Sequence, residues 1–487
     1  MSSPESLRAL DGHAQSELVR SGELTEAELL RAAVERIEAH DGRIGALAVT
    51  DFDRALSAAE RSAGRPRPER AGPLYGVPFL LKDLGPTVAD LEATMGSRFL
   101  AGFVPSQGSE LTDRFQAAGL RVLGKTRTPE FGVLPTTEPR HQGPTRNPWD
   151  LNRSAGGSSG GAAAAVAAGL VPIAHANDAG GSIRIPAATC GVFGLKPTRA
   201  RTPLGPAVGD LMSGLAAEHV ISRSVRDSAA VLDAIAGPAP GDPYWAPPAT
   251  GSYAGAVQRG LRGRKLRIAL STRAGLGPLD PACGAAVEQA GKLCWELGHE
   301  VTEAAPKVRF ADLVEPFLVL WAAGVSSAIS SYAQLSGRTP APDQFEPLTW
   351  RLYEQGRTLS AAQYLLSVAT LQRAARSLAG FYREYDLLLS PVTAWPAPVL
   401  GSFAIGTPDQ QLMRAIEFCH ETPLANLTGQ PAMSVPLHWT EEGLPIGTHV
   451  TGRFGAEATL FAFAAQLEAA QPWANRLPAA IHLRSES

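Results

Sequence analysis

Residues 154–205 read SAGGSSGGAAAAVAAGLVPIAHANDAGGSIRIPAATCGVFGLKPTRARTPLG and contain two serine-bearing glycine turns. The first turn is GGSSGG at 156–161, and the second is GGS at 180–182. Glycine permits positive φ angles and a close approach of substrate to backbone, and successive N–H groups in such turns can converge on an oxyanion. Either turn alone also fits an ordinary loop. A phosphate-binding P-loop is disfavoured because the GxxxxGK[ST] pattern is missing.

The segment between the two turns indicates how they are arranged. Ala162–Ala168 followed by Gly169 is typical of a helix with a glycine C-cap, and Val171–His175 is typical of a buried strand. A helix followed by a strand carries the chain out and back again. We therefore expect Ser158 and Ser182 to lie at the same edge of a sheet.

A serine nucleophile needs a base, and Lys82 is the candidate that the sequence offers. Lys82 follows the apolar run Val77–Leu81, which predicts a buried strand, and burial disfavours the ammonium form of lysine. The alternative is a structural lysine paired with Asp83. None of the 10 histidines has an obvious triad spacing; His141 and His175 are nearest in sequence and are more typical of structural histidines.

Strands alternate with helices along the rest of the chain, which predicts an α/β layered fold. Thr25–Glu28 reads as a capping box, and Asp280 with Pro281 begins another helix. The other expected elements are a helix at 111–118, strands at 121–123, 266–270 and 386–390, a mostly helical region at 310–383 and a helix at 456–469.

Composition limits the class of partner. The net charge is −3 and charged residues make up 19% of the chain, which gives no electrostatic case for nucleic acid or an anionic membrane. The amino terminus lacks a secretory apolar run, and the longest apolar runs, around 162–174 and 317–325, fall short of the ~20 residues that span a bilayer. The 4 cysteines show no CxxC spacing, so we expect a reduced cytoplasmic location.

Longer motifs resemble those of the amidase-signature family. They are GGSSGG at 156–161, DxGGSIRxPA at 178–187, GxxGLKPT at 191–198 and GLPIG at 443–447. The similarity extends over about 20–470 of the chain. It implies an α/β/α sandwich in which helices cover a large, mixed and twisted central sheet.

The resemblance also implies one domain over residues 1–487. Within it we expect N-terminal helices at 1–70, a catalytic core at 71–235 and a variable helical substrate-pocket region at 310–420. The expected partner is a small-molecule amide, and no cofactor or metal is needed. A homodimer is left open.

The family's catalytic roles fall on residues that are present here. By the resemblance, Ser182 is the nucleophile, Ser158 is the bridging serine after a cis peptide bond, and Lys82 is the base. Lys82 would take a proton from Ser158, which takes one from Ser182, and Ser182 would form an acyl-enzyme. The other implied roles are an oxyanion hole made by the N–H groups of Ala179, Gly180, Gly181 and Ser182, and support of the turn by Asp178, Arg184 and Ser159.

Some positions indicate a branch within the family. Ala176 replaces a common glycine and His449 replaces a frequent glutamine. The runs Arg184–Ala187, Gly241–Tyr244 and 443–461 are similar to the branch that contains hydrolases of the 6-aminohexanoate cyclic dimer and aryl-acylamidases. This similarity favours small uncharged amides that are apolar, aryl or cyclic.

Two other functions are weighed against this one. The glutaminase subunit of a tRNA-dependent amidotransferase is disfavoured by Ile185 and by Ala216–His219, which differ from that subunit's pattern. A non-catalytic binding scaffold is disfavoured because it would need neither the lysine nor the two serines. The candidate substrate-pocket residues are Phe317, Trp321 and Trp395, for which plain core packing is the alternative.

Overall fold

The computed structural model describes residues 4–62, 72–273 and 275–479, and a single large sheet lies at its centre. The strands of this sheet are β1 Leu47–Thr50, β2 Pro78–Lys82, β3 Arg121–Thr126, β6 Ile173–Asp178, β7 Phe193–Lys196, β8 Ala217–Ser222, β9 Arg267–Leu270, β10 Glu300–Glu303, β11 Leu387–Pro391, β12 Ala432–Trp439 and β13 Pro445–Gly452. Two further strands, β4 Arg146–Asn147 and β5 Asp150–Ser154, form a separate ribbon.

The 11 strands lie in the order β1-β3-β2-β6-β8-β7-β12-β13-β11-β9-β10. Strand β2 is parallel to β3 and β6, and β9 is parallel to β10 and β11. The other pairs, including β6 with β8, are antiparallel. The sheet is therefore mixed, as predicted. Its strand order places the C-terminal ends of β2 and β6 side by side, which is where the two glycine turns meet Lys82.

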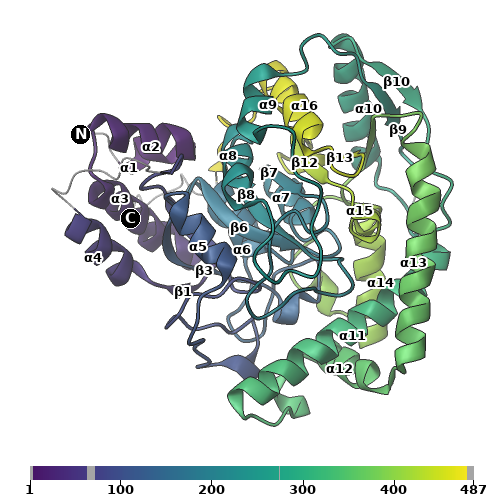
Figure 1. Cartoon of the computed structure of the whole chain (residues 1–487), viewed down its shortest axis with the longest axis horizontal. Coiled ribbons are helices and arrows are strands. Elements are labelled where there is room, and N and C mark those ends of the chain that lie inside the picture. Colours follow the sequence, from purple (N-terminus) through teal and green to yellow (C-terminus); the bar gives the residue numbers. More distant parts are fainter. Residues whose placement is uncertain (1–3, 63–71, 274, 480–487) are drawn as a thin grey trace.

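Helices cover both faces of the sheet. They are α1 Pro4–Arg8, α2 Gly12–Ser21, α3 Glu26–Ile44, α4 Phe52–Ser62, α5 Glu110–Ala117, α6 Gly160–Ala167, α7 Arg184–Cys190, α8 Val225–Ile235, α9 Tyr253–Arg259, α10 Pro281–Glu296, α11 Ala311–Ser336, α12 Pro347–Thr358, α13 Ala361–Phe381, α14 Pro408–Cys419, α15 Thr422–Thr428 and α16 Glu457–Ala470. Figure 1 shows α1–α4 beside the β1 and β3 edge, and α10 beside β9 and β10 at the opposite edge.

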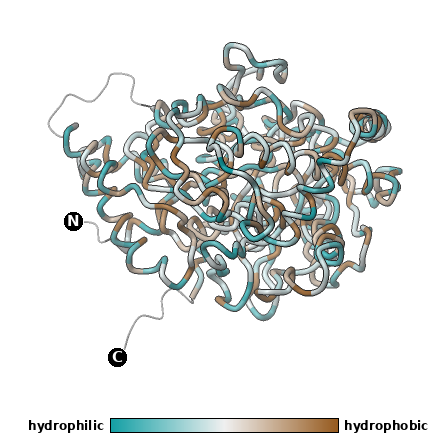
Figure 2. Tube along the Cα trace, turned by 90° about the horizontal axis from the view of Figure 1, so that it is seen from below, coloured by the Kyte–Doolittle hydropathy of each residue, from teal (hydrophilic) through white to brown (hydrophobic). Residues whose placement is uncertain are grey.

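The two helical layers follow from the alternation of side chains along each strand. Phe79 and Leu81 of β2 pack in a core with α5, α8, α9, α10 and α16. Leu80, between them, faces the other way and packs with α3, α6 and α7. Figure 2 shows hydrophobic segments running through the interior of the molecule. The predicted α/β/α sandwich is confirmed.

The N-terminal segment differs in one respect from the helices expected there. Between α3 and α4, residues 47–50 form the edge strand β1, which pairs with β3. The predicted capping box is present, since the Thr25 hydroxyl accepts from Glu28 N–H and Glu28 accepts from Thr25 N–H. Residues 63–70 of this expected segment lie outside the described residues.

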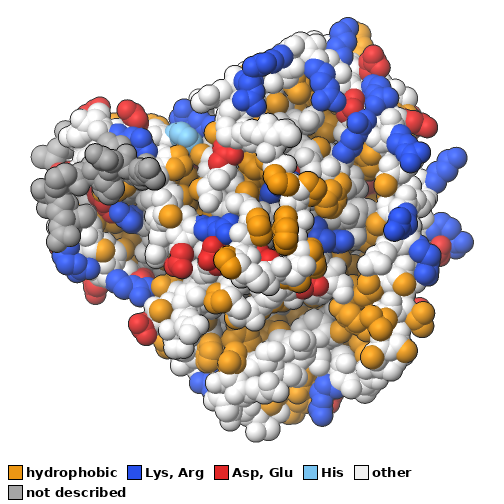
Figure 3. Space-filling model, in the orientation of Figure 1, with side chains coloured by type: hydrophobic (Ala, Val, Ile, Leu, Met, Phe, Trp, Pro, Cys, Tyr) orange, Lys and Arg blue, Asp and Glu red, His pale blue; other side chains and the backbone are white. Residues whose placement is uncertain are grey.

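Helix α11 is longer and more apolar than the uninterrupted runs of the sequence suggest. Among the described residues it alone is long and apolar enough to cross a membrane by length and composition, with a mean hydropathy of 1.5 over 18 residues. It packs against α12 and α13, and some of its apolar side chains face the cavity described below. Figure 3 shows hydrophobic side chains gathered on the face that carries these helices, where Leu365 and Leu366 of α13 are exposed.

Candidate active site

Strand β2 carries Lys82 into the interior, where its side chain is completely buried. The Lys82 Nζ atom lies 2.7 Å from Ser158 Oγ and donates to Asn177 Oδ1 at 2.6 Å. Burial lowers the pKa of Lys82 from 10.5 to about 7, against the opposing charges of Glu218 and Asp178, which raise it. A large share of this lysine is therefore neutral near pH 7, and a neutral amine can accept a proton.

The alternative in which Lys82 pairs with Asp83 is wrong. Asp83 lies 3.3 Å from the Nζ of Lys125, and both side chains are buried. The Asp83 carboxylate also accepts from the N–H and the hydroxyl of Thr94, at 3.0 and 2.6 Å. Successive side chains along an extended chain point to opposite faces of a sheet. The side chain of Asp83 therefore points away from the face that carries the Lys82 amine. Lys82 is left to contact Ser158.

The first glycine turn leads from β5 into α6. Its peptide bond between Gly157 and Ser158 is cis, as the family resemblance implies. The Ser158 side chain is buried beside Lys82. The next residue, Ser159, donates its N–H to the Ser182 carbonyl at 3.2 Å and its hydroxyl to the Asn177 carbonyl at 3.2 Å. Ser159 thus connects the first turn to the second.

The second turn leads from β6 into α7 and carries Ser182. Ser182 is half-buried and lines a mainly apolar cavity. The described residues contain no hydrogen bond between the hydroxyls of Ser158 and Ser182. The structure brings the two turns together through Ser159, and the direct contact required by the proton relay stays a prediction.

Asp178 holds the second turn through an ion pair with Arg184, 2.8 Å from Oδ1 to Nη2. Both side chains are buried, and the charge of Arg184 helps to hold the pKa of Asp178 well below its ordinary value despite burial. Asn426 links the pair, since its Nδ2 donates to Asp178 Oδ1 at 2.9 Å and its Oδ1 accepts from Arg184 at 2.6 Å. These contacts fit the supporting role expected of Asp178 and Arg184.

The backbone N–H groups of the second turn differ in whether they already donate a hydrogen bond. The N–H of Gly181 donates to Asp178 Oδ1 at 2.7 Å, so it is occupied. For Ala179, Gly180 and Ser182, no acceptor for the N–H lies among the described residues. Three of the four expected oxyanion donors are therefore available, whereas the expectation for Gly181 needs correction because the Asp178 carboxylate already accepts from it.

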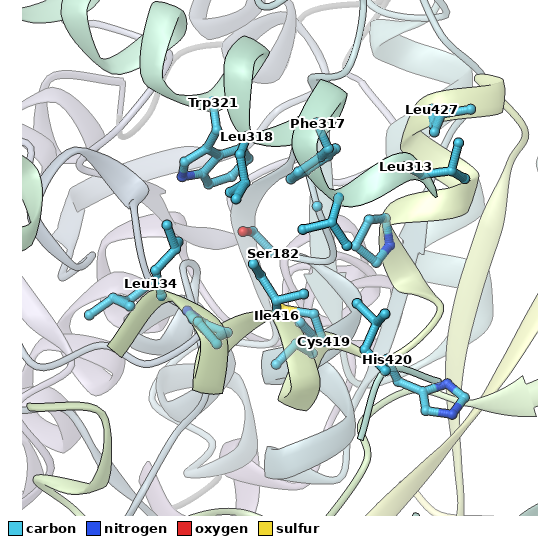
Figure 4. Close-up of a pocket in the computed structure, with 18 of the residues that line it drawn as sticks. Leu134, Ser182, Leu313, Phe317, Leu318, Trp321, Ile416, Cys419, His420 and Leu427 are labelled. Carbon is cyan, nitrogen blue, oxygen red and sulfur yellow. The ribbon is translucent and has the colours of Figure 1, made fainter. Parts of the chain in front are cut away.

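The cavity at Ser182 has a volume of about 870 Å³, counted with its open mouth. Figure 4 shows Phe317, Leu318 and Trp321 of α11 on one side of Ser182, with Ile416 and Cys419 of α14 on the other. Phe317 and Trp321 stack with ring centroids 5.4 Å apart. No Asp, Glu, Lys or Arg is among the described lining residues. His420 at the rim is neutral at pH 7, because burial lowers its pKa to about 4.

Trp395 does not line this cavity, although the sequence suggested it as a pocket residue. It packs instead on Phe418, with ring centroids 5.2 Å apart. Phe418 belongs to α14, and other residues of that helix, Leu412, Ala415, Ile416 and Cys419, line the cavity. His449, which departs from the family pattern, does not line the cavity either and lies 2.9 Å from Arg184 Nη1.

Two residues near Lys82, Asn177 and Glu218, were missed as candidate site residues, and His175, which was weighed as a base and judged structural, lies beside them. His175 and Asn177 lie two apart on β6, and Glu218 lies opposite Asn177 on β8. A signal was available, because a strand rarely buries polar residues at alternate positions without a partner. The described residues contain no group of three or more His, Cys, Asp or Glu side chains that could hold a metal ion.

Comparison with known proteins gives consistent matches over nearly the whole chain. The family model described as Amidase matches residues 28–461. The 6-aminohexanoate-cyclic-dimer hydrolase of Pseudomonas sp. (strain NK87) is 36% identical over 481 residues, covering 96% of each chain. A structure of 6-aminohexanoate cyclic dimer hydrolase complexed with substrate has a TM-score of 0.92 at 36% identity, covering 97% of this chain and 99% of that one. A bacterial aryl acylamidase of the amidase signature family has a TM-score of 0.88 at 26% identity, covering 98% and 99%.

Proposed function

The chain belongs to the amidase family, whose members hydrolyse carbon–nitrogen bonds, and from this premise we propose that it cleaves small uncharged amides by a Ser182 acyl-enzyme mechanism. The observation that carries the proposal is the contact of 2.7 Å between Lys82 Nζ and Ser158 Oγ, beside a turn that presents Ser182 to an apolar cavity.

The proposed reaction begins with neutral Lys82. Lys82 takes a proton from the Ser158 hydroxyl, Ser158 takes one from Ser182, and the Ser182 oxygen attacks the amide carbon. The carbonyl oxygen becomes an oxyanion, which the N–H groups of Ala179, Gly180 and Ser182 stabilise. The proton then returns along the relay to the leaving amine as the carbon–nitrogen bond breaks. Water hydrolyses the acyl-enzyme by the same relay.

The proposed substrate class follows from the wall of the cavity. Leucine, isoleucine, phenylalanine and tryptophan side chains dominate it, and burying apolar ligand surface there is favourable by about 25 cal/mol per Å². The similarity to hydrolases of the 6-aminohexanoate cyclic dimer supports cyclic and aliphatic amides within this class. The similarity to an aryl acylamidase supports anilides.

The glutaminase alternative is less well supported. Free glutamine carries an ammonium and a carboxylate, which need charged or hydrogen-bonding partners when they leave water. The described lining residues include none with a formal charge. The scaffold alternative is opposed by the buried lysine, since a binding function gives no reason to hold an amine 2.7 Å from a serine hydroxyl.

The experiment that tests the proposal is covalent labelling with a serine-directed fluorophosphonate, followed by mapping of the labelled residue. Labelling at Ser182, together with release of amine from a panel of lactams, anilides and primary amides, is the expected result. Labelling of a different serine, or amine release without any labelling, would overturn the proposed nucleophile.

A further inference from the structure

A buried polar cluster surrounds the Lys82 amine and is formed by two neighbouring strands. Asn177 of β6 and Glu218 of β8 lie directly opposite each other in the antiparallel register. His175, two residues before Asn177, shares its face of the sheet. His175 and Glu218 are buried and Asn177 is half-buried.

The side-chain amide of Asn177 can adopt only one orientation. Its Nδ2 donates to the Leu84 carbonyl at 2.8 Å and to Glu218 Oε1 at 3.3 Å. Both partners accept hydrogen bonds, so the nitrogen must face them. The amide oxygen then faces Lys82 Nζ at 2.6 Å.

Glu218 is held in place by a second donor. The backbone N–H of Lys82 donates to His175 Nδ1 at 3.2 Å, which makes Nδ1 the unprotonated nitrogen of a neutral ring. Its Nε2–H therefore donates to Glu218 Oε2 at 2.7 Å. Burial lowers the pKa of His175, which favours this neutral form. The two Glu218 oxygens thus accept from two different β6 side chains.

Close packing leaves little freedom for the cluster to rearrange. Gly85 lies against it with a φ of +105°, and a Cβ atom there would be 2.9 Å from Asn177 Nδ2 and 3.0 Å from Glu218 Oε1. Any larger residue would push the amide or the carboxylate out of position. The geometry at Lys82 therefore depends on a small residue in this loop.

The orientation of Asn177 decides where the lone pair of Lys82 points. An amide oxygen only accepts, so one N–H of the amine is committed to Asn177. A neutral amine has two N–H bonds and one lone pair. With Asn177 fixed by its neighbours, the lone pair is free to face the Ser158 hydroxyl, 2.7 Å away.

We propose that Asn177 and Glu218 are positioning residues for the Lys82 base: Asn177 directs the amine lone pair to Ser158, and Glu218 fixes Asn177 and stabilises the ammonium that forms when Ser158 gives up its proton. The inference rests on the proposed function, because it takes Lys82 as the base. It adds two residues that act through Lys82 and contact no substrate.

The charges around Lys82 determine in which direction its pKa should move when a neighbouring residue is replaced. The titratable groups that face it are Glu218 of β8 and Asp178 and His175 of β6. Asp83, directly after β2, pairs with Lys125 of β3. The charge of Glu218 raises the pKa of Lys82 against burial. Glu218→Gln removes that charge, and the pKa of Lys82 should fall further.

The experiment measures the rate at which fluorophosphonate labels Ser182 in the full chain between about pH 5 and 9. The wild-type rate should rise with a midpoint near the Lys82 pKa of about 7. In Glu218→Gln the midpoint should move down by about one pH unit, and the plateau should fall about tenfold, because a weaker base removes the proton less readily. Asn177→Leu, which has a similar volume and no acceptor, should shift the midpoint in the same direction.

Two controls separate positioning from general damage. Glu218→Asp keeps the charge and should restore most of the wild-type midpoint. Glu468→Gln removes a carboxylate on α16 that does not act on Lys82, and it should leave both midpoint and plateau unchanged. Melting temperatures show which variants fold. If Glu218→Gln does not fold, the midpoint of Asn177→Leu decides the test.

The outcomes distinguish the inference from the proposed function. Slower labelling of Ser182 with an unchanged midpoint in both variants would show that Asn177 and Glu218 act only structurally, which overturns the inference alone. No labelling of wild-type Ser182 at any pH overturns the proposed nucleophile and this inference with it.

Discussion

Asp83 pairs with Lys125 at 3.3 Å, although Lys82 is its neighbour in the chain. The pairing keeps the Asp83 carboxylate away from the Lys82 amine. A carboxylate in contact with Lys82 would hold it as an ammonium, and an ammonium cannot accept a proton. The separation of these two charges is therefore consistent with the role proposed for Lys82 as the base.

Replacement of the proposed nucleophile is the simplest test of the mechanism. Ser182→Ala should lower kcat by at least about 10³-fold, since no neighbouring group can supply the attacking oxygen. The melting temperature should stay near wild type because Ser182 is half-buried at a cavity edge. Ser402→Ala, at a half-buried serine that does not line the cavity, is the matched control. Turnover of the Ser182 variant near the wild-type rate would contradict the proposed mechanism.

The relay predicts strong non-additivity between Lys82 and Ser158. Each single alanine variant should lose several orders of magnitude in kcat, and the double variant should lose little more than the worse single one. The reason is that either change breaks the same proton path, which passes through the contact of 2.7 Å. Steady-state kinetics on one amide substrate measures this. Losses that multiply would mean that the two residues act independently.

The activity should depend on pH through Lys82. Its pKa is lowered from 10.5 to about 7, and only the neutral form accepts a proton. The rate should therefore be low below about pH 6, rise through about pH 7 and level off above about pH 8. Measurement of kcat/KM across this range tests the prediction. A rate that climbs steadily to pH 10 would indicate a lysine with an ordinary pKa.

Much of the fold could be predicted from periodicity and caps. The capping box at Thr25, the start of α10 at Asp280 and the helical region 310–383 follow local rules that the sequence shows directly. The edge strand β1 was missed because four residues between two helices carry little signal. Its pairing with β3 depends on a contact between distant segments, which local patterns do not encode.

The candidate site, like the fold, could be predicted from the sequence only in part. The glycine turns and Lys82 were found from motifs, whereas the partner of Asp83 and the acceptor of Gly181 N–H depend on side-chain directions. Trp395 was a candidate for the pocket because it is an aromatic residue within 310–420, the region expected to form the pocket. Its true place on Phe418 follows from the position of α14, which spacing alone does not give.

The ion pair under the second turn should matter for stability. Asp178→Asn should cost about 3–5 kcal/mol in the free energy of unfolding, because it leaves the Arg184 guanidinium buried without a counter-charge. Glu60→Gln, which breaks the exposed pair with Arg31, should cost at most about 1 kcal/mol. Urea unfolding of the two variants gives both values. Equal costs would contradict the role assigned to the buried pair.

The last prediction concerns the cavity wall and uses two tryptophans. Trp321 lines the cavity with Ser182, and Trp395 lies outside it on Phe418. Trp321→Ala should lower kcat/KM for an anilide or lactam by roughly 10- to 200-fold, as expected when apolar contacts worth about 1–3 kcal/mol are lost. Trp395→Ala removes the same side chain from a half-buried site and should leave kcat/KM for the folded enzyme near wild type.

The same pair of variants can be tested with glutamine to separate substrate classes. Wild-type kcat/KM for an anilide should exceed that for glutamine by about a thousandfold, because the apolar wall offers no charged partner to a zwitterion. Trp321→Ala should narrow that ratio by weakening only the apolar substrate, and Trp395→Ala should leave it unchanged. Amine release from both substrates at equal enzyme concentration measures the ratio. Glutamine turnover equal to that of the anilide in the wild-type enzyme would favour the glutaminase function instead.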